Sequence, residues 1–160
     1  MNNLFDVGTI DILTRLGIAL LLGMIIGIER VWAHKTAGMR TYALVAMGAA
    51  LFIIISEMVG VQYLNIYTFD PTRIAAQIVM GVGFLGTGLI FSRESKLIGL
   101  TTATGLWVSA GIGMAAGFKL YGVAVIATAL TLFVFVVLWY VEELIKKSKH
   151  FIGRDQSDSN

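Results

Sequence analysis

The residues best suited to chemistry stand together where the first long apolar stretch of the chain ends. Glu29 and Arg30 close that stretch, and Arg40 opens the next one after a short polar connection. A carboxylate and two guanidinium groups at the shared end of two consecutive helices favour an ion pair that closes a helical hairpin. Unpaired charges at membrane depth cost free energy, and arginine forms bidentate hydrogen bonds. The alternative is a functional site for a cation or a partner, since ionisable groups within membrane spans mark pathways.

Uncharged polar side chains provide the other candidates for a cation path. Gln77 lies one turn into the third apolar stretch, and Thr101 and Thr102 lie at the start of the fourth. If the chain moves an ion, we expect these three residues and Glu29 to line its path. Helix association explains the same polar side chains without any transport, because hydroxyl and amide groups form hydrogen bonds between membrane helices.

A second polar pattern lies further along the fourth stretch. Thr102, Gly105 and Ser109 are spaced i, i+3 and i+7, so they fall on one face of a helix. This small and polar face predicts hydrogen bonding to a neighbouring helix.

Glycines form the densest motif of the chain, in the segment from Gly81 to Gly88. The segment contains the GxGxxG string of dinucleotide-binding folds, but that fingerprint requires a preceding strand in a βαβ unit, so we reject a cofactor role. Close helix packing is the favoured interpretation, as it is for Gly23-x-x-x-Gly27 and Gly113-x-x-x-Gly117. A locally unwound helix that exposes carbonyl groups to an ion is the functional alternative.

The elements that must position these residues are membrane helices. A hydrocarbon core about 30 Å thick requires roughly 20 apolar residues per helix, and the stretch from Leu97 to Val141 contains Lys119 as its single charged residue. Arg15 and Glu57 can reach the interface on long side chains, which extends the first two runs to Ile10–Ile28 and Thr41–Val59. The runs free of charged residues are Leu16–Ile28, Thr41–Ser56, Ile74–Ser92, Leu97–Phe118 and Leu120–Val141.

We therefore predict an all-α integral membrane protein with five transmembrane helices. Residues 1–145 form the membrane domain, and residues 146–160 form a basic and then polar cytoplasmic tail that we expect to be disordered. Hydrophobic residues make up 57% of the chain and charged residues 14%, which leaves no room for a soluble domain. The sequence contains no cysteine, Walker motif or Ser-His-Asp set and no basic groove, so we expect neither an enzyme nor a nucleic-acid partner.

The basic residues predict the orientation. With five spans the two termini face opposite sides, and one side collects nine lysines and arginines against three on the other. The positive-inside rule then places the N-terminus outside and the C-terminus in the cytoplasm. The nine are Arg30, Lys35, Arg40, Arg93, Lys96, Lys146, Lys147, Lys149 and Arg154, and the three are Arg15, Arg73 and Lys119.

Two segments of this chain resemble the MgtC/SapB family over about residues 16–124. The first runs Gly27-x-Glu29-Arg30 and then Ala37-Gly38-x-Arg40-Thr41-x-x-Leu44-Val45-x-x-Gly48-Ala49. The second, more specific segment runs Arg73-x-x-Ala76-Gln77-x-Val79-x-Gly81-x-Gly83-Phe84-Leu85-Gly86-x-Gly88-x-Ile90, followed by Gly99-Leu100-Thr101-Thr102-Ala103 and Trp107. Thr87 and Thr104 depart from small residues expected there, and Tyr42 stands where histidine is common in the family.

The resemblance implies a multi-pass protein of the bacterial inner membrane that serves Mg²⁺ homeostasis and adaptation to low Mg²⁺, in some members linked to virulence. Family members are described both as Mg²⁺ transporters and as regulators of other membrane machines, including P-type ATPases and the ATP synthase. Longer members carry a soluble C-terminal domain, whereas only about 20 residues follow the fifth predicted helix here.

Mid-membrane carboxylates are absent from the sequence, and Mg²⁺ prefers oxygen ligands that include carboxylates, so we favour regulation of a membrane partner by helix contacts. Mg²⁺ would then be a sensed ion and no cofactor is expected. A transporter or channel, and a structural scaffold, are the alternatives. Small-residue motifs also favour a homo-oligomer. The residues expected to matter for function or packing are Arg30, Arg40, Thr41, Gly81, Gly83, Gly86, Gly88, Gly99 and Trp107.

Overall fold

The computed structural model of the chain describes residues 7–62, 70–93 and 96–155, and most of these are helical. Residues 134–138 form one π-helical turn between α5 and α6, so residues 121–155 make one continuous helix. The elements are α1 (Val7–Trp32), α2 (Met39–Gln62), α3 (Pro71–Leu89), β1 (Phe91–Arg93), β2 (Lys96–Ile98), α4 (Leu100–Gly117), α5 (Tyr121–Phe133), η1 (Val134–Leu138) and α6 (Trp139–Asp155).

Helix α3 begins at an acidic cap. The carboxylate of Asp70 accepts hydrogen bonds from the Thr72 backbone N–H at 2.9 Å and from the Thr72 hydroxyl at 2.7 Å. Pro71 occupies the first turn, where its missing N–H leaves no hydrogen bond unmade. Hydrogen bonds from the Thr72 hydroxyl and backbone N–H stabilise the charged carboxylate and hold the pKa of Asp70 below its usual value.

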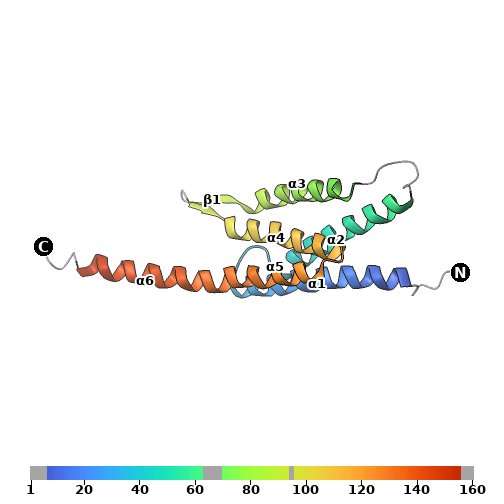
Figure 1. Cartoon of the computed structure of the whole chain (residues 1–160). Coiled ribbons are helices and arrows are strands. Elements are labelled where there is room, and N and C mark those ends of the chain that lie inside the picture. Colours follow the sequence, from blue (N-terminus) through green and yellow to red (C-terminus); the bar gives the residue numbers. More distant parts are fainter. Residues whose placement is uncertain (1–6, 63–69, 94–95, 156–160) are drawn as a thin grey trace.

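The helices form a bundle in which α4 is central (Figure 1). α1 and α5 lie side by side, α2 packs against both α1 and α4, and α3 lies on the opposite side of α4. The long α5–α6 helix extends past the rest of the bundle, and the two termini lie at opposite ends of the molecule (Figure 1). The core clusters centre on buried side chains from α1, α2 and α4, such as Ile26, Tyr42, Ile53 and Leu106.

Four helices in the described part of the chain are long and apolar enough to cross a membrane, which is consistent with an all-α membrane protein. They cover Gly8–Trp32, Met39–Val61, Thr72–Leu89 and Tyr121–Lys147. The remaining predicted span, the fourth, corresponds to α4, which has 18 residues and differs from the others because it is rich in glycine, alanine, serine and threonine. Its central position accounts for that composition, since small side chains allow the neighbouring backbones to approach.

Close packing by glycine is confirmed for the two motifs outside α3. A Cβ on Gly23 would lie 2.6 Å from the Tyr42 carbonyl oxygen, and a Cβ on Gly27 would overlap the backbone of Met39. On α4, a Cβ on Gly113 would overlap the backbone of Ala46. All three glycines therefore bring their own helix against α2 at backbone contact.

The hairpin between α3 and α4 and the length of α6 both differ from the sequence-based expectation. The connection between α3 and α4 contains the antiparallel hairpin β1–β2, whose three-residue strands are too short to carry a periodic signal. Gly99 follows it with a φ of 93°, a left-handed conformation that favours glycine.

Helix α6 also continues to Asp155, into the segment that was expected to be a disordered tail. An ion pair of 2.8 Å between Lys146 and Glu142, at i, i+4 spacing, supports the helix at the start of that segment. Residues 1–6 of the expected membrane domain and residues 156–160 of the expected tail lie outside the described residues.

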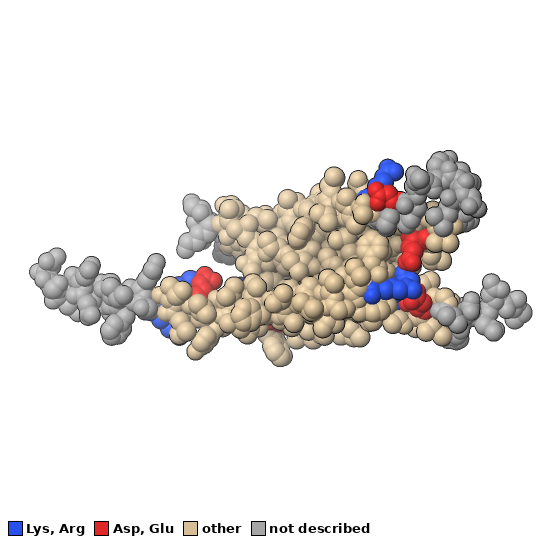
Figure 2. Space-filling model, viewed as in Figure 1, with Lys and Arg blue, Asp and Glu red and all other residues tan. Residues whose placement is uncertain are grey.

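On the face drawn in Figure 2, the charged residues lie toward the ends of the bundle. Large hydrophobic side chains such as Leu13, Met80, Phe84 and Ile126 are more than half exposed. An exposed apolar surface of this extent suits lipid contact and is unusual for a water-soluble monomer. The chain is therefore consistent with a multi-pass membrane protein.

Candidate functional site

The structure pairs Glu29 with its immediate neighbour. The Nε of Arg30 donates to the Glu29 carboxylate, and the two side chains are 3% and 15% exposed. The expected ion pair across the hairpin involved Arg40, but Arg40 and Thr41 are exposed at the start of α2. The Glu29 carboxylate is thus paired within α1 and not across the hairpin.

Arg30 also stacks on an aromatic ring from a distant part of the chain. Its guanidinium carbon lies 3.4 Å from the centroid of the Phe135 ring, in cation–π geometry. Phe135 belongs to the π-helical turn η1, and π-turns are frequent at functional sites. Sequence reasoning missed Phe135 because a single extra residue in an apolar helix leaves no pattern in composition or charge.

Helix α4 is joined to α2 by two buried hydrogen bonds. The Tyr42 hydroxyl donates to the Thr102 carbonyl oxygen at 3.0 Å, and the Ser109 hydroxyl donates to the Tyr42 carbonyl oxygen at 3.0 Å. A Cβ on Gly105 would lie 2.6 Å from the Tyr42 hydroxyl and 2.5 Å from Cζ of Phe135. The predicted hydrogen bonding between helices is confirmed for the Ser109 side chain, whereas Thr102 takes part through its backbone carbonyl and Gly105 through close approach. All three residues meet Tyr42.

A cavity of about 570 Å³ lies beside Arg30, between the end of α1 and the α5–α6 helix. We call it the α1/α6 cavity. Glu29 and Thr101 both line it, so the structure brings together two of the four residues expected to line a cation path. Thr102, the third, does not line the cavity and is buried in the contact with α2.

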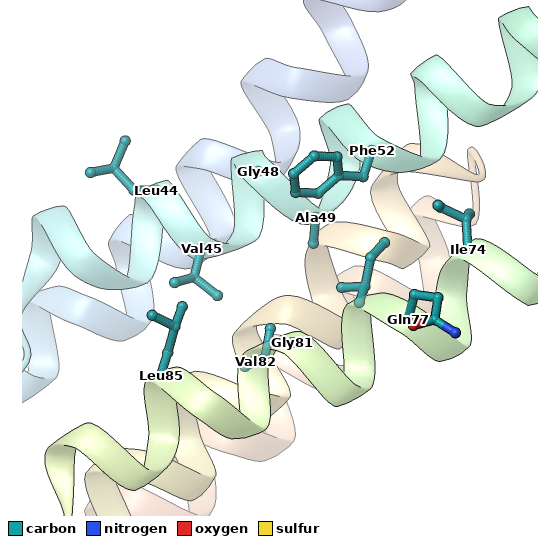
Figure 3. A pocket seen from close by; sticks show the side chains of 11 residues that line it. Leu44, Val45, Gly48, Ala49, Phe52, Ile74, Gln77, Gly81, Val82 and Leu85 are labelled. Carbon is teal, nitrogen blue, oxygen red and sulfur yellow. The ribbon is translucent and has the colours of Figure 1, made fainter.

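Gln77 lies in a different depression. It lines a groove of about 580 Å³ between α2 and α3, and the other residues that line this groove are apolar (Figure 3). Phe52 and Ile74 flank the amide end of this groove, whereas Leu44 and Leu85 lie toward the other end (Figure 3). We call it the α2/α3 groove. Gln77 and Glu29 therefore do not line one common cavity.

Most glycines of α3 border open space. Cβ atoms built on Gly81, Gly83 and Gly88 would meet nothing within 4 Å, whereas one on Gly86 would contact the Ala103 Cβ at 3.7 Å. The helix runs uninterrupted from Pro71 to Leu89, so this segment is helical rather than unwound. Sequence reasoning favoured packing for these glycines, but among the described residues Gly86 is the one of the four that packs against a neighbour.

Trp107 and Gly99 lie at the edges of this region. Trp107 projects from α4 and is exposed. Gly99 is the N-cap residue of α4, and a Cβ there would overlap the Leu89 carbonyl oxygen. The turn from the hairpin into α4 therefore requires glycine at this position.

The opposite end of the bundle holds a charge cluster that sequence reasoning missed. Arg15 is 5% exposed and pairs with Asp11 at 2.5 Å and with Glu57 on α2. Its Nη1 also donates to the Gly117 carbonyl oxygen at 3.1 Å, and Lys119 pairs with Asp11 at 3.0 Å. Arg15 and Glu57 were expected to reach the interface separately, whereas the fold uses them to tie α1, α2 and the end of α4 together.

Metal coordination by a cluster of acidic or histidine side chains is not seen in residues 7–62, 70–93 and 96–155. In those residues no three His, Asp or Glu side chains come close enough to hold an ion.

Comparisons with known proteins identify a family. The model of the MgtC family matches residues 16–144. The chain is 41% identical over 145 residues to the putative magnesium transporter YhiD of Escherichia coli K12, which covers 89% of this chain and 67% of that protein. It is 47% identical over 110 residues to protein MgtC of Brucella abortus strain 2308, covering 69% and 44%. It is also 44% identical over 120 residues to the uncharacterized protein slr0014 of Synechocystis, covering 75% and 49%.

The chain spans about two thirds of the YhiD protein and less than half of the MgtC proteins that it matches. No solved structure matches it.

Proposed function

Because this chain belongs to the MgtC family, we propose that it is an inner-membrane protein of Mg²⁺ homeostasis and low-Mg²⁺ adaptation. The name of the Escherichia coli relative, a putative magnesium transporter, supports the link to Mg²⁺. We propose that the chain acts without enzymatic chemistry or a resident cofactor, by contacting a membrane partner through its helices. The chain matches only part of its relatives, so this role concerns the membrane domain that they share.

We propose five membrane passes, with the N-terminus outside. The fold supports this topology because α4 runs between the two ends of the bundle like its neighbours (Figure 1). The connection after α1, the hairpin and α6 lie at one end, and these elements contain most of the basic residues. The positive-inside rule assigns that end to the cytoplasm.

The observation that carries the proposed regulatory role is the exposed face of α3. On this face, Cβ atoms built on Gly81 and Gly88 would meet nothing within 4 Å. Gly81 and Gln77 line the α2/α3 groove (Figure 3). In a bilayer, small residues allow another helix to approach, and an amide exposed to lipid gains a hydrogen bond when a partner helix packs over it. Glycines that no contact with residues 7–62, 70–93 and 96–155 requires are better explained by a partner outside the chain.

The partner class that we propose is another multi-pass membrane protein, such as a P-type ATPase or the ATP synthase, with a second copy of this chain as a further occupant. The family resemblance suggests the first class and the small-residue face supports both. A transporter or channel is the second candidate function, favoured by the presence of Glu29 and Thr101 in one cavity. The position of Gln77 in a separate groove supports the regulatory role over this one.

Two variants separate these functions. Gly81→Leu places a large side chain on the open face of α3, and Gly122→Leu, on α5, is its matched control because a Cβ there also meets nothing within 4 Å. We expect both variants to fold, and only Gly81→Leu to lose the ability to restore growth in low Mg²⁺ to a bacterial host that lacks its own family member. Equal growth of the two variants would contradict the role of this face.

Transport is tested with the purified protein in liposomes. Mg²⁺ uptake above that of empty vesicles, lost on Glu29→Gln, would make the chain a transporter and overturn the regulatory role. Tolerance of both Gly81→Leu and Glu29→Gln in the growth assay would instead indicate a structural scaffold.

A further inference from the structure

The residues of the α1/α6 cavity suit a small ligand that carries both a positive and a negative charge. Its lining includes two carboxylates, Glu29 and Glu142, and two cations, Arg30 and Lys35. They come from the end of α1, the connection that follows it, and α6. Four charges of balanced sign around one cavity favour a zwitterion over an anion or a cation.

Arg30 is the fixed part of this cavity. The residue is 2% exposed, Phe135 covers one face of its guanidinium, and its Nε donates to Glu29. Among the described residues, the bond to Glu29 is the one hydrogen bond that the Arg30 guanidinium makes. The two terminal nitrogens of Arg30 therefore remain available to a ligand. Guanidinium groups bind phosphate oxygens well because their planar donors match the geometry of the anion.

The walls of the cavity identify the environment of that ligand. Trp32 and Trp139 both line it and are both more than half exposed, as tryptophans at the headgroup level of a bilayer are. Val136 and Leu138 continue the lining along the membrane helix, where acyl chains would lie. The cavity is therefore polar at one side and apolar at the other, in the order of a lipid at an interface.

We propose that the α1/α6 cavity binds a phospholipid whose headgroup carries a phosphate and a primary ammonium, as phosphatidylethanolamine does. Arg30 and Lys35 face the phosphate, and Glu142 receives the ammonium. Glu142 is free to do so because its pair with Lys146 is an exposed one, with side chains 63% and 62% exposed, and such pairs are weak. This inference is independent of the proposed role of α3.

The test is native mass spectrometry of the delipidated full chain in detergent. The probes are phosphatidylethanolamine, phosphatidylcholine and phosphatidylglycerol with identical acyl chains, and soluble phosphoethanolamine. We expect phosphatidylethanolamine to bind best, because phosphatidylcholine cannot donate hydrogen bonds from nitrogen and phosphatidylglycerol has no cation. Equal binding of the three lipids would overturn the proposal, and so would saturation by phosphoethanolamine at equal concentration, which would indicate a soluble ligand.

A matched pair of variants tests the assignment of Glu142. Glu142 and Glu143 both lie beside Lys146, but only Glu142 of the two lines the cavity. We expect Glu142→Gln to reduce the preference for phosphatidylethanolamine over phosphatidylglycerol by about fivefold, the value of one partly exposed ion pair. Glu143→Gln should keep the full preference, and an equal loss in both variants would contradict the site.

Lys35→Gln tests the phosphate side. Lys35 is exposed, so its replacement leaves the fold intact. We expect weaker binding of all three lipids, with the preference for phosphatidylethanolamine retained. Unchanged binding would show that Lys35 does not face the phosphate and would overturn this orientation of the headgroup.

Discussion

Replacement of Gly113 by alanine tests whether α4 and α2 meet at backbone contact. A Cβ on Gly113 would overlap the carbonyl oxygen, carbonyl carbon and Cα of Ala46. These are backbone atoms, which cannot rotate away as a flexible side chain can, so the two helices must separate. Such overpacking costs about 1–3 kcal/mol, which exceeds the gain of about 0.5–1 kcal/mol from removing a glycine inside a helix.

The matched control for that substitution is Gly111→Ala. Gly111 lies on the same helix two residues earlier, and a Cβ there meets nothing within 4 Å. The assay is thermal unfolding of the purified protein in detergent. Since 1 kcal/mol shifts Tm by about 2–4 °C at this chain length, we expect Gly113→Ala to lower Tm by several degrees and Gly111→Ala to leave it unchanged or higher. An unchanged Tm for Gly113→Ala would refute the close contact between α2 and α4.

Three further predictions concern other parts of the bundle. Tyr42→Phe leaves the Thr102 carbonyl without its donor and should cost about 1–2 kcal/mol, measured as a lower Tm, and an unchanged Tm would mean that this bond adds no stability. Arg15→Met removes the shared partner of two carboxylates and should cost about 2 kcal/mol, visible as easier unfolding by denaturant. An unchanged unfolding curve would mean that solvent screens the cluster. The pKa of Asp70 is lowered by its bonds to Thr72, so its stabilisation is complete above the unfolded pKa and is lost as pH falls through the lower folded value. Tm measured against pH should therefore fall more in acid for the native chain than for Asp70→Asn, which keeps a cap that does not titrate.

The elements and part of the packing could be predicted from the sequence because they depend on local patterns. The cap at Asp70 and Pro71 is a signal of two residues, and the face formed by Thr102, Gly105 and Ser109 follows from helical spacing. The partner of that face, Tyr42, could not be predicted. It stands 60 residues before Thr102, and spacing within one helix says nothing about the neighbour that the helix meets.

The features that were missed depend on the relative position of distant segments. Arg15 and Glu57 are 42 residues apart, and their ion pair follows from the lateral offset between α1 and α2. The stacking of Phe135 on Arg30 depends on the π-helical turn, which rotates one residue out of the regular helical order. The short hairpin β1–β2 lacks enough residues to show alternation.

The glycines show why the same residue type must be judged by its place in the fold. The backbone of α2 occupies the space beside Gly23, Gly27 and Gly113. The distances between α1, α2 and α4 therefore cannot change without breaking contacts, and the three helices form a unit. Helix α3 is attached differently, because its buried residues Ile78, Val82 and Gly86 make a single stripe.

A partner that packs on the open face of α3 therefore needs no rearrangement of the α1–α2–α4 unit. The energy of that contact is then available for binding, since little of it is spent on separating helices that already pack together. A membrane protein that acts by contact benefits from such a division, in which one part holds the fold and a second, lightly attached helix meets the partner.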